Sequence, residues 1–153
     1  MINIYIDTSG SMLEMGKDSA LLYLAKSIED YCSFKDINTN FFTLDTQVIK
    51  DLTSIKFSND IKLDTNKIKS NNILISDGLF KSEEESIFDI SFSIGIDSDT
   101  LNLKKISTKV FSNDNIIDGL EYLIFTNNLL NSNITQEEDD DEFVNEMEIK
   151  AKT

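Results

Sequence analysis

Near the start of the chain, an aspartate and two serines follow one another at two-residue intervals within residues 7 to 11, DTSGS. The glycine lets the backbone curl, so the Asp7 carboxylate and the Ser9 and Ser11 hydroxyls can converge. Hard cations such as Mg²⁺ prefer oxygen ligands in a near-octahedral shell. Asp77 follows another apolar run and can close the opposite side, directly or through water. The spacing predicts an oxygen-ligated cation whose open position favours an outside carboxylate.

The composition removes most other chemistries. The 153 residues include no His, no Arg and one Cys, which excludes His-activated nucleophiles, imidazole acid-base catalysis and zinc sites built on His or Cys. The one thiol, Cys32, lies in a helical apolar pattern and is expected to be a buried small hydrophobic residue. It cannot form an internal disulfide, which favours a reducing compartment.

The formal charge of −14 argues against nucleic acid and anionic membrane surfaces as partners, because both require Lys/Arg stripes. Basic or cation-bridged partners fit this charge better. The first apolar run has no cationic start and is interrupted at Asp7, and no apolar stretch approaches the roughly 18 residues of a membrane span. We therefore expect a soluble cytoplasmic protein, and the Asn-, Ile- and Lys-rich composition is typical of an AT-rich bacterial genome.

The hydrophobic pattern predicts alternating strands and helices. Residues 2–6 indicate a strand, and apolar positions three or four apart indicate an amphipathic helix over 18–34. Asp114 is the expected cap of a closing helix, and Glu83–Glu85 is expected as the first turn of an exposed one. Residues 52–72 give no clear pattern. The remaining expected elements are a β-hairpin over 41–44 and 47–49, strands at 73–76, 90–96 and 109–111, and a helix over 116–124.

This order predicts a three-layer, Rossmann-like α/β domain over residues 1–134, in which helices flank a mostly parallel sheet with one antiparallel edge strand. Binding sites in such sheets lie beyond the carboxyl ends of the strands, the position of Asp7 and Asp77. Residues 135–153 include six consecutive acids and are expected to form a flexible acidic tail. Such charge runs are more often solubilising than partner-specific.

The run at residues 7–12 resembles the Asp-x-Ser-x-Ser element of von Willebrand factor A (vWA) domains. Residues 73–78, ILISDG, resemble the later family strand that ends in Ser-Asp-Gly, and residues 92–97 resemble the next strand with its glycine. The segment Leu101–Phe125 follows the family order, so the likeness covers residues 1 to about 130.

In that family the equivalent residues form a metal-ion-dependent adhesion site. The resemblance implies that Ser9 and Ser11 coordinate Mg²⁺ or Mn²⁺, whereas Asp7 and Asp77 act largely through water or through contacts to the ligands. The open ion position would take an acidic residue of a partner protein. Free-standing bacterial members often serve as adaptors beside AAA+ ATPases or in other multi-protein systems.

One family element is missing from residues 52–72. The family normally has a Gly-Gly-Thr loop there, whose Thr completes the ion's shell, and this chain has no such run. Alignment of the flanking apolar positions places Asp60 where the Thr is expected, and Thr65 is a second candidate. A carboxylate from Asp60 would tighten cation binding but weaken the attraction of an anionic partner.

The leading hypothesis is therefore a non-enzymatic, metal-dependent protein interaction module. One alternative is a Mg²⁺-dependent phosphoryl-transfer enzyme with Asp7 as nucleophile, although such enzymes carry a second acid where Ser9 stands. Another is a metal-free vWA scaffold that uses other surfaces, such as the acidic tail. Taken alone, residues 7–11 fit a helix-capping turn as well as they fit a cation site.

Overall fold

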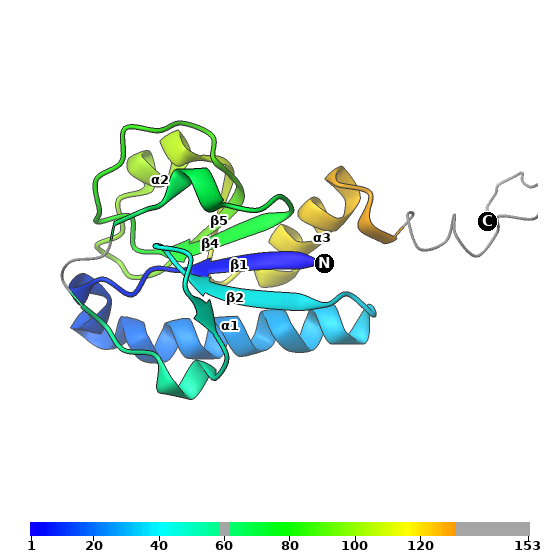
Figure 1. Cartoon of the computed structure of the whole chain (residues 1–153), viewed down its shortest axis with the longest axis horizontal. Helices are drawn as coiled ribbons and strands as arrows, with labels where there is room; N and C mark the ends of the chain where they lie inside the picture. Colours follow the sequence, from blue (N-terminus) through cyan, green and yellow to red (C-terminus); the bar gives the residue numbers. More distant parts are fainter. Residues whose placement is uncertain (59–61, 131–153) are drawn as a thin grey trace, which may run out of the picture. The chain divides into compact units, whose positions relative to one another are not determined.

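The computed structural model describes residues 1–58 and 62–130. Within this part of the chain, six strands form one sheet in the order β3-β2-β1-β4-β5-β6 (Figure 1). All neighbouring strands are parallel except β2 and β3 at one edge, which pair antiparallel. The strands are β1 (Ile2–Ile6), β2 (Thr39–Thr43), β3 (Val48–Ile49), β4 (Asn72–Ser76), β5 (Phe88–Ser93) and β6 (Ser107–Ser112).

Helices cover both faces of this sheet. The long helix α1 (Lys17–Phe34) lies beside α3 (Ile116–Thr126). A hydrogen bond that the Tyr31 hydroxyl of α1 donates to Glu121 of α3 shows this contact. Gly119 places α3 against β5, since a Cβ atom there would lie 2.6 Å from the Phe92 ring. The short helix α2 (Thr100–Ile106) buries Leu103 and Ile106 in a different cluster, on the face of Tyr5. The domain is a three-layer, Rossmann-like α/β fold, as expected.

Strand β1 lies in the middle of the sheet, and all five of its residues are buried. Side chains alternate between the two faces of a strand, so Ile4 and Ile6 point away from the face that Tyr5 occupies. The Tyr5 ring stacks on Phe42 of β2, with 5.0 Å between ring centroids. A strand that is buried on both sides is typical of a sheet covered on both faces. The buried β1 strand in turn fixes the position of Asp7, the residue that follows it.

The predicted strands and the two long helices are confirmed, with some shifted ends. The strand expected over 90–96 is β5, which runs from Phe88 to Ser93, because the chain leaves the sheet before Gly95 at φ +93°. The sequence pattern did not reveal α2, which at seven residues is too short for a clear helical period.

Two local expectations were wrong. Residues 83–85 form no helix, and the amide of Glu84 instead bonds the Ser82 hydroxyl at 3.2 Å. Helix α3 begins at Ile116, so the residue before it is Asn115 rather than the expected cap Asp114.

The unassigned segment over 52–72 contains two short 3-10 turns within its described part, η2 (Leu52–Ser54) and η3 (Thr65–Lys67), an isolated β-bridge at Ser58, and Asn72, the first residue of β4. Asp60, the predicted domain end at residue 134 and the acidic tail over 135–153 lie outside the described residues. The sheet belongs to a compact unit, Met1–Leu123, and a second unit begins at Ile124. Among the described residues, no helix has both the length and the apolar character needed to span a membrane.

Leu74 tests the packing of the sheet, because it is fully buried in the cluster around Tyr5. We expect Leu74→Ala to lower the free energy of unfolding by about 2–5 kcal/mol in urea denaturation. Leu101→Ala is the matched control, since Leu101 is largely exposed on α2, and its cost should stay within about 0.5 kcal/mol. Equal effects of the two substitutions would contradict the assigned core.

Cys32 is buried on α1, and burial raises the pKa of its thiol to about 11. The reactive thiolate is therefore scarce at pH 8, and the sulfur is shielded as well. We expect iodoacetamide to label the folded protein on the order of a hundredfold more slowly than the urea-unfolded chain. Mass spectrometry reads the result directly because the chain has one Cys. Equally fast labelling of the two states would show that Cys32 is accessible.

Candidate metal-binding site

Asp7 and Asp77 meet because they follow neighbouring parallel strands. Ile6 of β1 pairs with Ile75 of β4, and the Asp7 amide continues this ladder with a 2.9 Å hydrogen bond to the Ile75 carbonyl. The two strands flank the point where the strand order reverses, the usual place for a site in this fold class. Both aspartates have 0% exposure.

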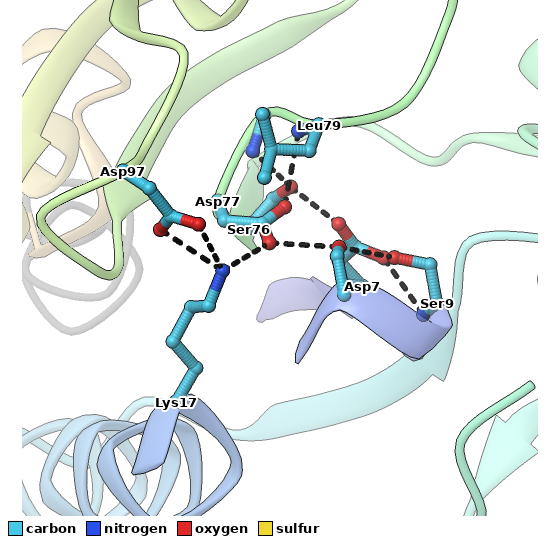
Figure 2. A network of polar contacts seen from close by, with 9 residues as sticks. Asp7, Ser9, Lys17, Ser76, Asp77, Leu79 and Asp97 are labelled. Carbon is cyan, nitrogen blue, oxygen red and sulfur yellow. Dashed lines mark hydrogen bonds and ion pairs between the residues drawn. The ribbon is translucent and has the colours of Figure 1, made fainter. Parts of the chain in front are cut away.

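The Asp7 carboxylate joins the two loops. Its Oδ1 accepts a 2.9 Å hydrogen bond from the Ser9 amide, within its own loop. Its Oδ2 accepts a 2.6 Å bond from the hydroxyl of Ser76, the last residue of β4 (Figure 2). That hydroxyl in turn accepts the Gly78 amide at 2.8 Å. Asp7 thus holds the β1 and β4 loops together.

Three oxygens from these loops lie close to one another. The Ser9 and Ser11 hydroxyl oxygens are 3.3 Å apart, and the Ser11 hydroxyl donates to Asp77 Oδ2 at 2.8 Å. In an octahedral Mg²⁺ shell with bonds of about 2.1 Å, adjacent ligand oxygens lie about 3.0 Å apart. The donor set therefore fits a hard divalent cation. Among the described residues, no three carboxylate, thiol or imidazole side chains form a group that could hold a metal ion. An ion at these loops would therefore need the hydroxyls among its ligands.

The backbone fixes the position of Asp77. Its Oδ1 accepts the Leu79 amide at 3.0 Å, and its carbonyl accepts the Asp99 amide at 2.7 Å. Gly78 makes this approach feasible, because its φ is +74° and a Cβ atom there would lie 2.5 Å from the Asp99 carbonyl oxygen. The loop after β4 is thus fixed against the residues that precede α2.

The structure adds a cation that sequence reasoning missed. Lys17, the first residue of α1, is only 2% exposed, and its Nζ lies 2.9 Å from Asp77 Oδ2 (Figure 2). The same Nζ lies 3.0 Å from both carboxylate oxygens of Asp97, in the loop after β5. The sequence offered one signal for this role, the position of Lys17 at the start of a helix. A lysine is unfavourable at that positive end of the helix dipole unless acidic groups compensate its charge.

The neighbours of Asp7 and Lys17 shift their pKa values. Burial raises the pKa of Asp7, as does the nearby Asp77 charge, and the hydrogen bonds from Ser76 and Ser9 oppose the rise only in part. Burial alone would lower the pKa of Lys17, but its bonds to Asp77 and Asp97 outweigh burial and raise it. Lys17 is therefore a permanent cation at neutral pH.

The segment after η2 approaches the site from another side. The Ser58 amide donates a 2.8 Å hydrogen bond to the Thr8 carbonyl, and Ser58 forms an isolated parallel bridge with Ser9. Ser58 therefore lies beside the loop that carries Ser9, whereas Asp60, the sequence-based candidate from this segment, lies outside the described residues. Thr65 instead lines a hollow of about 460 Å³ with Leu63 and Phe80, and no hydrogen bond in the described chain joins it to the four predicted ligands.

The structure brings together all four residues that the sequence singled out, Asp7, Ser9, Ser11 and Asp77. A search of protein-family models found no match to this chain, and no curated protein matches its sequence.

The raised pKa of Asp7 gives a testable pH dependence. Because ionised Asp7 is less favourable in the folded protein than in the unfolded chain, its contribution to stability falls as pH rises through its raised pKa. We expect Asp7→Asn, which keeps an oxygen for the Ser9 amide, to raise the thermal unfolding midpoint in EDTA at pH 7. The gain should shrink as pH falls and Asp7 becomes protonated.

Asp51→Asn is the matched control. Asp51 is an exposed carboxylate whose pKa is lowered by hydrogen bonds from Thr53 and Ser54. This group stabilises the fold above its ordinary pKa, so its neutralisation should bring no gain at pH 7. An Asp7→Asn protein that melts below wild type in EDTA would contradict the assigned environment of Asp7.

Proposed function

We propose that this chain is a metal-ion-dependent protein interaction module of the vWA type. Asp7, Ser9, Ser11 and Asp77 would hold Mg²⁺ or Mn²⁺. The proposal rests on one observation, the convergence of the Ser9 and Ser11 hydroxyls with the Asp77 carboxylate, at oxygen–oxygen distances of 3.3 and 2.8 Å. The likeness of the sequence motifs to the vWA family supports the same assignment.

The ion would supply a Lewis-acidic point for an acidic side chain of a partner protein. Neutral hydroxyls leave more positive charge on the ion than carboxylates would, which favours an anionic ligand from outside. Large apolar side chains near the site in sequence are exposed, with Ile96 at 98% and Leu13 and Met15 more than half exposed. Such residues suit a protein partner better than a small charged substrate.

The surroundings of Asp7 favour binding over catalysis. Both carboxylate oxygens accept hydrogen bonds, and the group has no exposed surface from which to attack a phosphoryl group. Ser9 also stands where a phosphoryl-transfer enzyme of this kind needs its second acid. The proposed partner is thus a protein, for which the family likeness suggests an AAA+ ATPase or another component of a cytoplasmic bacterial assembly.

One observation favours a second candidate, a metal-free scaffold of the same fold. The Lys17 ammonium already neutralises Asp77, so the site has an internal cation without any bound metal. In that case partner binding would use other surfaces and would survive EDTA.

Calorimetry with MgCl₂ and MnCl₂ separates these candidates. We expect one ion per chain for wild type and at least about a tenfold loss of affinity for Ser9→Ala/Ser11→Ala, because two ligands are removed. Ser27→Ala/Ser33→Ala removes two hydroxyls from the distal part of α1 and should bind like wild type. Identical titrations of the wild-type and Ser9→Ala/Ser11→Ala proteins would contradict the proposed metal site and favour the metal-free scaffold.

A further inference from the structure

We propose that Lys17 is a built-in counter-ion that competes with the divalent cation for Asp77 and so sets how tightly the ion is held. This inference rests on the proposed metal site and names a control of its affinity. It concerns a residue outside the ligand set, contributed by the start of α1.

The geometry places Lys17 and the proposed ion on the same carboxylate oxygen. Asp77 Oδ2 receives the Lys17 ammonium at 2.9 Å and the Ser11 hydroxyl at 2.8 Å. A cation that this oxygen coordinates directly must share it with the ammonium or displace the ammonium, and a cation held through water still meets the repulsion of the nearby positive charge. Lys17 cannot leave easily, because it is 2% exposed and its aliphatic chain lies against the loop at Gly95, where a Cβ atom would be 2.7 Å from Lys17 Cδ.

Asp97 gives the ammonium a second partner. Both of its carboxylate oxygens lie 3.0 Å from Lys17 Nζ, and its side chain is 31% exposed, so water screens part of its charge. When an ion occupies Asp77, Lys17 can remain paired with Asp97. The Lys17 ammonium therefore has a carboxylate partner both with and without a bound ion.

The charges explain what Lys17 contributes. Asp7, Asp77, Asp97 and Lys17 together carry −2, so one divalent ion makes this cluster neutral. Without the lysine the same cluster would be −3, and the ion would leave it at −1, which repels a partner carboxylate. Lys17 thus weakens ion binding by repulsion and strengthens the field that draws an acidic partner.

A purely structural role predicts the opposite result. If Lys17 only held Asp77 in place, its loss would disorder a ligand and weaken ion binding. Asp77, however, keeps the Leu79 amide on Oδ1 and the Ser11 hydroxyl on Oδ2 without the lysine. Repulsion should therefore dominate, and removal of the charge should tighten ion binding.

The experiment measures Mn²⁺ affinity by electron paramagnetic resonance for wild type, Lys17→Met, Lys17→Arg and Asp97→Asn. We expect Lys17→Met to bind about tenfold more tightly than wild type, and Lys17→Arg, which keeps the charge, to stay within about threefold of it. Asp97→Asn keeps every proposed ligand but leaves Asp77 as the one carboxylate partner of the ammonium. This variant should therefore bind Mn²⁺ at least about threefold more weakly than wild type.

Thermal unfolding in EDTA is the second readout. Lys17→Met should melt well below wild type, since Asp77 stays buried without a cation, and Mn²⁺ should raise its midpoint more than that of wild type. If Lys17→Met does not fold in EDTA, Asp97→Asn still tests the proposal through the sign of its effect.

The outcomes separate this inference from the proposed function. Wild type that binds Mn²⁺ while Lys17→Met binds equally or more weakly overturns the role of Lys17 and leaves the metal site standing. Lys17→Met that binds when wild type does not supports the counter-ion and overturns metal-dependent function. No binding by either protein overturns both.

Discussion

The central constraint on this fold is the burial of two carboxylates at the tips of adjacent strands. Asp7 and Asp77 have no exposed surface, and an unpaired buried charge is strongly destabilising. Hydrogen bonds offset part of this cost. Asp7 accepts them from the Ser9 amide and the Ser76 hydroxyl. Asp77 accepts them from the Leu79 amide and the Ser11 hydroxyl. Lys17 adds the one buried positive charge within the described chain. The groups that offset the burial of the two carboxylates thus also form the candidate binding site.

This constraint explains why the loops are built as they are. Parallel pairing of β1 with β4 fixes the two aspartates in register, and the Ser76–Asp7 bond then joins their loops. Gly78 brings the chain before α2 into contact with the Asp77 carbonyl, so the loops after three strands, β1, β4 and β5, meet at one place. Binding or loss of a cation at Asp77 would therefore also change the contacts of the loop that carries Asp97.

The sequence predicted the parts of this arrangement that repeat along the chain or sit at strand ends. Apolar runs predicted β1 and β4, and polar residues directly after them predicted Asp7, Ser9, Ser11 and Asp77 as a group. Lys17 was missed because its role depends on Asp77 and Asp97, sixty and eighty residues away, which no local pattern connects. Helix α2 was missed because seven residues give too few turns for a period to appear. Glu83–Glu85 suited a helix start by charge, but the apolar residues that follow them, Phe88 and Ile90, are buried in strand β5 rather than on a helix.

The most direct test of the account is anomalous diffraction from crystals of the protein grown in MnCl₂. We predict one manganese peak within bonding distance of the Ser9 and Ser11 hydroxyl oxygens, next to Asp77, with Lys17 still paired to Asp97. Crystals that show no manganese there, with the Lys17 ammonium unmoved on Asp77, would contradict the claim that this cluster of buried carboxylates and hydroxyls is an ion site.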